Sequence, residues 1–239
     1  MQVLLLDLDE TLYPPERGVL HRVDGRINAY LRDRMGIPRH EVDAVRRELR
    51  RAHGTTLRGL VLRHAVDQDE YLRFVHDCDL SDLLAPDPKL RELLERLPPR
   101  KVVFTNSPRA HARQVLRLLD VEEVLPEVFA LEDLAYLPKP DPAAYRAVLS
   151  WVGVPASACC MVDDTRMNLL PASALGMRTV WKARDARLCD DVHHVISELG
   201  ELEALWREGG PGASASGCLP HAAESVPLAP PKPRGCRPG

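Results

Sequence analysis

Residues 2–14 read Gln-Val-Leu-Leu-Leu-Asp-Leu-Asp-Glu-Thr-Leu-Tyr-Pro, and this stretch decides the fold. The apolar run from Val3 to Leu6 is too short for a buried helix, so it predicts a central strand covered on both faces. In an open parallel sheet the functional crevice lies beyond the carboxyl ends of the strands, which places Asp7 and Asp9 at its edge. Two carboxylates this close resist joint ionisation and need a cation or a proton. The alternative is that both residues only end a strand and form a turn, where Asp is common.

Two more apolar runs, 101–105 and 158–162, predict strands that also end in polar side chains. Polar residues lie at the end of each of the three predicted strands: Asp7 and Asp9 at the first, Thr105 and Asn106 at the second, and Asp163 and Asp164 at the third. Lys139 adds a cation from the segment between the second and the third. If they converge, each pair of like charges costs about 3 kcal/mol at ~5 Å in an effective dielectric near 20. One lysine does not offset four carboxylates. A hard divalent cation does, and an all-oxygen site that leaves room for water and a phosphate suits Mg²⁺.

The rest of the chain alternates strand-like runs with helical periodicity, which predicts an α/β fold: a doubly wound parallel sheet with a Rossmann-like core. Further strands are predicted near 128–130 and 178–181, and a last helix over 195–206. Asp141-Pro142 and Ser107-Pro108 are both typical of helix starts, with Asp141 and Ser107 as N-caps.

Residues 15–85 carry helical periodicity without a strand-like run, so they predict a helical cap inserted after the first strand. Helices are expected over 23–36 and 39–52, and Gly54 to Gly59 are predicted to form a loop with a close backbone approach. The predicted domains are a catalytic core (1–14 and 86–208), the cap (15–85), and a disordered Pro/Gly-rich tail (209–239). For the tail, the alternative is that residues 227–233 form a polyproline ligand.

The composition narrows the possible partners. The 239 residues carry a net charge of −3, which gives no general attraction to nucleic acid or to anionic membranes. No apolar run reaches membrane-spanning length, and the N-terminus is typical of a core strand rather than a signal peptide. The six cysteines lack zinc-site spacing, as expected for a reducing compartment. We therefore expect a cytoplasmic protein, and the sequence identifies no protein partner.

Four segments, taken in order, resemble the motifs of the haloacid dehalogenase-like hydrolase superfamily. They are DLDET at 7–11, VFTN at 103–106, Lys139 within LPKPDP, and VDDTRMN at 162–168. The resemblance extends over about residues 1–205, and the joint pattern is much more specific than any one motif. Separately, each motif has an ordinary structural explanation, such as a solvated loop lysine for Lys139 or a helix cap for Asp163 and Asp164.

The resemblance implies a role for each matching residue. Asp7 would be the nucleophile that forms an aspartyl-phosphate, and Asp9 the acid and base, with its backbone carbonyl as a Mg²⁺ ligand. Thr105 and the N–H of Asn106 would hold the phosphoryl oxygens, and Lys139 would neutralise their charge. Asp164 would be the direct metal ligand, supported by Asp163 and Asn168, although the two acids could exchange roles. An acid two residues after the nucleophile favours phosphate esters over halides, because halide leaves without a proton.

Further segments are similar to the pyrimidine 5′-nucleotidase-like branch of the superfamily. These are the Tyr-Pro after DLDETL, GTTLRGL at 54–60, FVHD at 74–77 and FTNSPRAHA at 104–112. In the cap, the candidate substrate-binding residues are Thr55, Thr56 and Arg58, with Tyr13 and His76 behind them. Glu10 and Ser107 depart from the residues frequent in the family, and neither is expected to touch a catalytic group.

The leading hypothesis is a Mg²⁺-dependent phosphatase of a small phosphorylated metabolite, with a nucleoside 5′-monophosphate as one candidate substrate. The alternatives within enzymes are a phosphomutase and a phosphatase of phosphoglycolate or sugar phosphates. The alternative outside enzymes is a regulatory module that binds a phosphorylated ligand without turnover.

Overall fold

A computed structural model of the protein describes residues 1–184, 187 and 190–207. The predicted tail and the cysteines at 189, 218 and 236 lie outside these residues. Within the described part of the chain, no helix is both long enough and apolar enough to cross a membrane. The described cysteines, at 78, 159 and 160, are free thiols.

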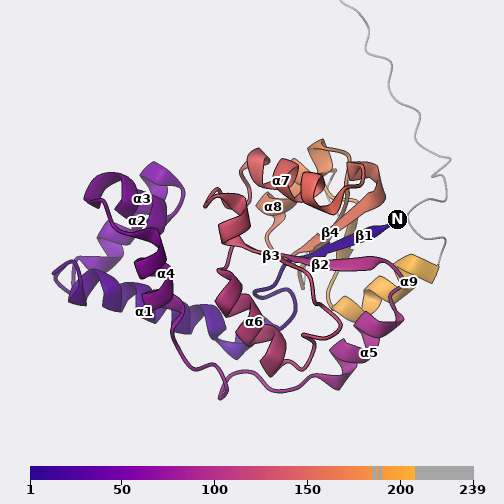
Figure 1. The fold of residues 1–239 in the computed structure, drawn as a ribbon, viewed down its shortest axis with the longest axis horizontal. Coiled ribbons are helices and arrows are strands. Elements are labelled where there is room, and N and C mark those ends of the chain that lie inside the picture. Colours follow the sequence, from indigo (N-terminus) through magenta and orange to yellow (C-terminus); the bar gives the residue numbers. More distant parts are fainter. Residues whose placement is uncertain (185–186, 188–189, 208–239) are drawn as a thin grey trace, which may run out of the picture.

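The core is a six-stranded sheet in the order β3-β2-β1-β4-β5-β6, with every neighbouring pair parallel (Figure 1). The strands are β1 (Val3–Leu6), β2 (Arg100–Phe104), β3 (Val128–Phe129), β4 (Cys159–Asp163), β5 (Arg178–Lys182) and β6 (His194–Ile196). This arrangement confirms the predicted doubly wound sheet, with β1 at its centre.

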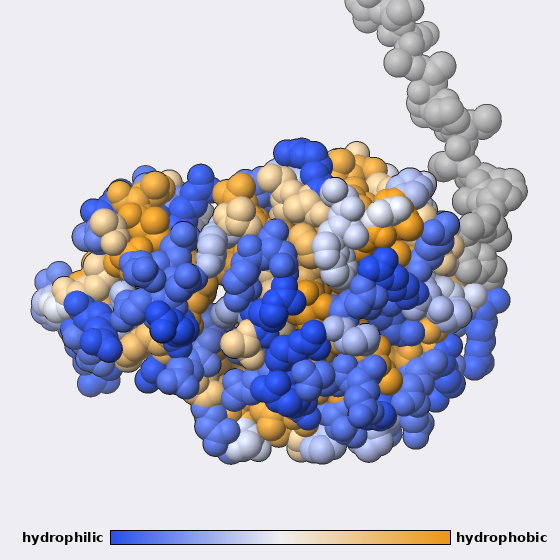
Figure 2. Space-filling view, viewed as in Figure 1, coloured by the Kyte–Doolittle hydropathy of each residue, from blue (hydrophilic) through white to orange (hydrophobic). Residues whose placement is uncertain are grey.

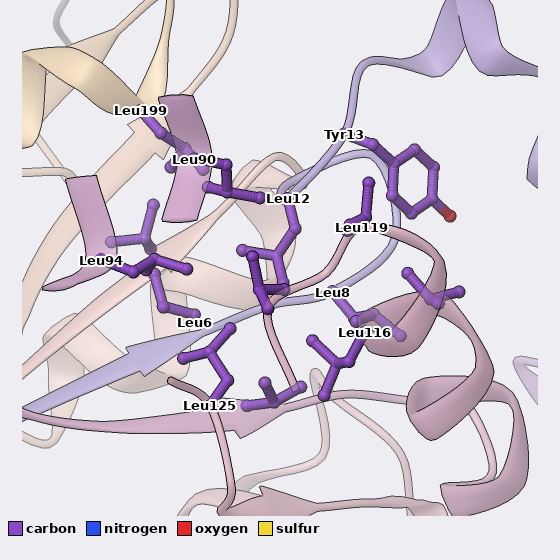
Figure 3. Close-up of a cluster of buried hydrophobic side chains, with 14 of the residues drawn as sticks. Leu6, Leu8, Leu12, Tyr13, Leu90, Leu94, Leu116, Leu119, Leu125 and Leu199 are labelled. Atoms are coloured by element: carbon purple, nitrogen blue, oxygen red, sulfur yellow. The ribbon is translucent and has the colours of Figure 1, made fainter. Parts of the chain in front are cut away.

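Alternate side chains of β1 enter two separate cores, because successive residues of a strand point to opposite faces. Leu4 and Leu6 pack on one face with α5 (Pro88–Arg96), α6 (Arg109–Leu118) and α9 (Leu202–Arg207). Figure 3 shows Leu90 and Leu94 of α5 and Leu116 of α6 around Leu6. Val3 and Leu5 pack on the other face with α7 (Pro142–Val152) and α8 (Arg166–Ala174). The strand is therefore covered on both faces, as its apolar run predicts.

Short 3₁₀ helices complete the core: η1 (Pro15–Arg17), η2 (Leu131–Leu134), η3 (Ala156–Ala158) and η4 (Leu199–Glu201). The last predicted helix is wrong in its first half, because 194–196 form β6 beside β5. The backbone N–H groups of Ser197 and Glu198 donate to the Glu201 carboxylate at 2.8 and 2.9 Å, which ends the strand in a turn. Only residues from Leu202 onward form an α-helix.

Between β1 and α5 the chain forms four helices: α1 (Val19–Asp33), α2 (Val42–His53), α3 (Thr56–His64) and α4 (Gln68–His76). We call residues 15–85 the cap. Its helices lie to one side of the sheet in Figure 1, and in Figure 2 cap and core form two lobes with an indentation between them at the upper edge. The first two helices confirm the predicted helical segments. The predicted loop 54–59 is wrong, because Thr55 accepts a hydrogen bond from the Arg58 N–H at 3.0 Å and starts α3.

The close approach expected at the glycines occurs at Gly59, inside α3. A Cβ added there would lie 2.9 Å from Leu49 Cβ of α2, which is too close without a shift. We expect Gly59→Ala to destabilise the protein by about 1 kcal/mol, since overpacking costs about 1–3 kcal/mol and helix propensity returns about 1. The matched control is Gly25→Ala in α1, where a Cβ would meet nothing within 4 Å. It should stabilise by about 0.5–1 kcal/mol. Urea denaturation checks both, and equal effects at the two positions would contradict the packing argument.

Candidate active site

The carboxyl ends of the three central strands meet at one edge of the sheet. Leu6 is in register with Val103 of β2 and with Val162 of β4, so the residues that follow each strand are neighbours. The N–H of Asp7 donates to the Val162 carbonyl at 2.9 Å, which continues the pairing one residue past β1. Asp7 is 7% exposed, and Thr105 and Asp163 are almost fully buried. The sheet thus brings together side chains that are more than 150 positions apart.

Lys139 joins these strand ends from a loop. Its buried Nζ donates to Asp7 Oδ1 at 2.7 Å, to Asp163 Oδ2 at 2.8 Å and to the Phe104 carbonyl at 2.8 Å. Burial acts to lower the pKa of Lys139, but the charges of Asp163 and Asp7 outweigh it and raise that pKa above its usual range. The ammonium is therefore held charged inside the site rather than solvated in the loop.

The side chain of Asn106 holds Lys139 in place. Its Nδ2 donates to the Lys139 carbonyl at 3.0 Å, and its Oδ1 accepts from the Lys139 N–H at 2.8 Å. This reciprocal pair fixes the loop against the end of β2. The sequence predicts a phosphate contact for the backbone N–H of Asn106 but gives no sign of this side-chain function.

Three carboxylates form a group with ligand atoms within 4.8 Å of one another: Asp7, Asp163 and Asp164. Burial, with the charges of Asp163 and Asp164, raises the pKa of Asp7 well above its ordinary value despite Lys139. The pKa of Asp164 is raised by burial and by the charge of Asp163. Three acids against one lysine leave excess negative charge, and all the donor atoms are hard oxygens. These residues fit a divalent cation such as Mg²⁺.

The two neighbouring acids differ in how many of their hydrogen-bonding positions are filled. Both oxygens of Asp163 accept from Asn168 Nδ2, and Asp163 also accepts from Lys139 and the Thr165 N–H. Asp164 is half-buried, and its Oδ1 accepts from the Thr11 hydroxyl at 3.1 Å. Among the described residues, Asp164 Oδ2 has only a long contact of 3.4 Å with the Thr165 hydroxyl. Asp164 is therefore the acid with room for a further partner.

The carboxylate of Asp9 lies outside that group of three acids and has its own donors. It accepts from the Tyr13 hydroxyl and from His111 Nε2 at Oδ1, at 2.5 and 2.9 Å, and from the Ser107 hydroxyl at Oδ2, at 2.5 Å. Burial acts to raise the pKa of Asp9, but His111 and the hydroxyls of Ser107 and Tyr13 hold it below its usual range. The metal contact expected of Asp9 involves its backbone carbonyl, which none of these side-chain hydrogen bonds occupies.

Two predictions about Ser107 are wrong. It does not cap α6, because Pro108 is at the N-cap and no side chain caps that end. It also does touch a proposed catalytic group, since its hydroxyl is bonded to Asp9. His111 was given no role by the sequence analysis. The available signal was its place within the FTNSPRAHA segment at 104–112, which begins at the end of the predicted strand.

His76 was predicted to lie behind the candidate substrate-binding residues of the cap. Its buried Nδ1 has no partner among the described residues, and its ring meets the His111 ring edge-on with centroids 4.8 Å apart. Burial lowers the pKa of His76 to about 3, so the ring is neutral. Tyr13, which was predicted to lie behind the same cap residues, donates a hydrogen bond from its hydroxyl to Asp9. In Figure 3 its hydroxyl points away from the leucine cluster.

A cavity of about 470 Å³ lies between cap and core. Its walls include all three predicted cap residues, Thr55, Thr56 and Arg58, together with Asn106 of the core. Arg58 is exposed and makes no ion pair with a carboxylate of the described chain. A hydrogen bond of 2.5 Å from the Tyr136 hydroxyl to Asp69 Oδ1 connects the core to α4 across this region. The cavity is therefore lined by the predicted phosphate-binding residue Asn106 on the core side and by cap residues on the other side.

Known proteins share this architecture. A HAD phosphatase from Thermococcus onnurineus superposes with a TM-score of 0.62 at 21% identity, covering 88% of this chain and 99% of its own. The Saccharomyces cerevisiae protein named "Phosphate metabolism protein 8" is 25% identical over 191 residues, which is 74% of this chain and 60% of that protein. A phosphoglycolate phosphatase from Rhodospirillum rubrum is 37% identical over 78 residues, 33% of this chain and 32% of the relative. This chain thus spans less than two thirds of either relative.

The haloacid dehalogenase-like hydrolase profile matches residues 1–176, which run from β1 past α8. The matched segment contains Asp7, Asp9, Lys139 and the two acids at the end of β4, Asp163 and Asp164, so it includes the whole arrangement described above. The chain therefore belongs to the haloacid dehalogenase-like hydrolase family.

Proposed function

We propose that the protein is a Mg²⁺-dependent phosphatase that hydrolyses small phosphate monoesters through an aspartyl-phosphate on Asp7. The observation that carries this proposal is the buried Lys139 ammonium bonded to both Asp7 and Asp163, with Asp9 two residues from Asp7. Lys139 occupies Asp7 Oδ1, so Oδ2 remains for attack on phosphorus. Mg²⁺, held by Asp7, the Asp9 carbonyl and Asp164, would supply positive charge to the phosphoryl oxygens.

In the proposed first step an oxygen of Asp7 bonds to phosphorus and the bond to the leaving oxygen breaks. In this step Asp9 must carry a proton when the ester is bound, although its hydrogen bonds favour the carboxylate in the free site. It gives that proton to the leaving oxygen, so an alcohol departs rather than an alkoxide. Asp9 then takes a proton from water, whose oxygen attacks phosphorus and breaks the bond to Asp7. Thr105 and the Asn106 N–H hold the phosphoryl oxygens in both steps, and Lys139 offsets their charge. Asp163 holds Lys139, and its hydrogen bonds to Asn168 and the Thr165 N–H fix it in place.

The substrate is proposed to be a small phosphorylated metabolite whose leaving group occupies the cavity under the cap. Apolar side chains such as Leu57 and Val61 line it alongside Arg58 and the two threonines. A nucleoside 5′-monophosphate suits such mixed walls, in agreement with the resemblance to the pyrimidine 5′-nucleotidase-like branch. Phosphoglycolate and sugar phosphates are the alternatives. A cytoplasmic location is part of the proposal, supported by the free thiols at 78, 159 and 160.

Released phosphate, measured for nucleoside monophosphates, sugar phosphates and phosphoglycolate with Mg²⁺ or with a chelator, tests this function. We expect turnover of at least one ester that is lost with the chelator. Transfer to a second sugar phosphate in preference to water would instead identify a phosphomutase. Binding of phosphorylated ligands without turnover of any ester would support the regulatory module.

Substitution of Arg58 tests the role of the cap. Because Arg58 is exposed in the cavity wall, Arg58→Gln should raise KM for the preferred ester about 10-fold with little change in kcat, as expected for a charge-assisted hydrogen bond to the substrate. Arg146→Gln is the matched control, because Arg146 lies in α7 and not in the cavity wall. An unchanged KM in Arg58→Gln would remove Arg58 from substrate binding.

Mg²⁺ should stabilise the fold as well as support activity. Without a cation, the raised pKa of Asp7 means that the folded state binds a proton more tightly than the unfolded state, so stability falls as the pH rises above the ordinary carboxyl range. Saturating Mg²⁺, at about 100 times its Kd, adds about 2.7 kcal/mol. Thermal denaturation at pH 5 and pH 8 should show the larger Mg²⁺ effect at pH 8. A Tm that does not respond to Mg²⁺ at either pH would contradict the metal site.

A further inference from the structure

The two oxygens of the Asp9 carboxylate have different surroundings. Oδ1 accepts two hydrogen bonds, from Tyr13 and from His111, while Oδ2 accepts one, from Ser107. All three donors are at least nine-tenths buried, and the Asp9 side chain is 11% exposed. These contacts hold the carboxylate in one orientation, and they come from two segments, the loop after β1 and the start of α6.

The surroundings of His111 identify which of its two ring nitrogens carries the hydrogen. Its Nδ1 is buried and has no partner among the described residues, while Nε2 lies 2.9 Å from Asp9 Oδ1. With the hydrogen on Nε2 the ring donates to a carboxylate and leaves only an acceptor unpaired. With the hydrogen on Nδ1 a buried donor would be unpaired and Nε2 would face the carboxylate without a hydrogen. Nε2–H is therefore the group that donates to Asp9. The ring of His76, which belongs to the cap, packs against the ring of His111.

Two donors are directed at Oδ1, and one of them, the Nε2–H of His111, cannot change into an acceptor, so Oδ1 is the less favourable oxygen for a proton. At Oδ2 the only partner among the described residues is the Ser107 hydroxyl, which can rotate and change from donor to acceptor. When Asp9 is protonated, its proton is thus on Oδ2. When Asp9 is ionised, Oδ2 accepts a hydrogen bond from the Ser107 hydroxyl. The arrangement in the structure is the second of these two states.

We infer that Ser107 and His111 are positioning residues for Asp9. His111, together with Tyr13, occupies Oδ1 with hydrogen bonds, so the proton that goes to the leaving oxygen comes from Oδ2. Once that proton has left, Oδ2 accepts a hydrogen bond from the Ser107 hydroxyl. The inference rests on the proposed phosphatase function. As the phosphorus–oxygen bond breaks, its electron pair takes the proton from Oδ2, and the negative charge left on Oδ2 is met by the Ser107 O–H. That hydrogen bond strengthens as the proton leaves, so it stabilises the transition state more than the ground state.

Two esters of similar shape, phenyl phosphate and 4-nitrophenyl phosphate, separate this role from a general loss of activity. Phenolate needs a proton to leave much more than 4-nitrophenolate does. Ser107→Ala and His111→Phe should lower kcat/KM for phenyl phosphate about 10- to 100-fold, the effect of losing a hydrogen bond to a charged group. The loss for 4-nitrophenyl phosphate should stay under about threefold, since its leaving group needs little acid catalysis. His111→Gln, which keeps an N–H donor, should recover most of the phenyl phosphate activity.

The matched control is Ser81→Ala, because the Ser81 hydroxyl also donates to a carboxylate, Asp79 Oδ2 at 3.0 Å, but on an exposed segment. Ser81→Ala should leave kcat/KM unchanged for both esters. In an Asp9→Asn background, Ser107→Ala should cause no further loss of kcat/KM. Equal losses for the two esters would overturn the inference while the phosphatase proposal stands. No turnover of either ester by the wild-type protein with Mg²⁺ would overturn both. If His111→Phe does not fold, Ser107→Ala decides the result alone.

Discussion

Asp7→Asn will abolish hydrolysis of phosphate monoesters and leave the fold intact. The amide cannot form the bond to phosphorus, so kcat should fall on the order of 10⁴-fold or more, as when a covalent nucleophile is removed from a hydrolase. The fold should tolerate the change because an amide oxygen still accepts from Lys139 Nζ. One negative charge also leaves a group that has an excess of them. Without metal, the Tm of the variant should equal or exceed that of the wild type.

The measurement is single-turnover phosphate release with the preferred ester, alongside thermal denaturation. Asp43→Asn is the matched control, since Asp43 is exposed in the first turn of α2 and should affect neither quantity. Activity in Asp7→Asn comparable to the wild type would exclude Asp7 as the nucleophile. A lost activity accompanied by an unfolded protein would leave the nucleophile to be tested with Asp7→Ser, which is shorter and uncharged.

Lys139→Met will have the largest effect on stability. The variant removes the only cation bonded to Asp7 and Asp163 in the described part of the chain and leaves two buried carboxylates without it. Breaking a buried pair in this way costs about 3–5 kcal/mol, which is a large share of the 5–15 kcal/mol typical of a whole domain. Activity should also be lost, because the charge that faces the phosphoryl group disappears.

Urea denaturation with and without Mg²⁺ checks this expectation. Mg²⁺ should restore part of the lost stability, because a second cation then faces the same acids. Lys101→Met is the control: within the described part of the chain Lys101 Nζ donates only to the Pro99 carbonyl at 3.2 Å, and its loss should cost less than about 1 kcal/mol. A free energy of unfolding for Lys139→Met within 1 kcal/mol of the wild type would mean that the buried pair contributes little.

The sheet could be predicted because its strands are short apolar runs that end in polar residues. The run from Val3 to Leu6 has no other stable environment than a central strand, and the order of strands and helices then sets the topology. The errors lie where a local hydrogen bond decides between two structures. Thr55 starts α3 inside a predicted loop, and Glu201 accepts from the N–H groups of Ser197 and Glu198, which forms a turn directly after β6.

The acids and the lysine could be predicted as neighbours because strand ends in a parallel sheet share one edge. Residues that depend on the orientation of α6 could not. His111 reaches Asp9 only because α6 starts at Arg109, two residues before it, and turns that ring toward the loop after β1. Nothing in the sequence alone fixes this rotation. The same holds for the Asn106 side chain, whose hold on Lys139 depends on the path of the loop 135–140.

The central position of β1 has a consequence for how the protein is made. Val3 pairs with Arg100 on one side and with Cys159 on the other. During synthesis the first strand therefore leaves the ribosome long before either neighbour exists, and its apolar residues stay unpaired while the cap is translated. Pairings over such separations are intrinsically slow to form. The nascent chain thus exposes the apolar residues of β1 at least until β2, which ends at Phe104, has been made, and transiently exposed hydrophobic surface of this kind is what chaperones bind.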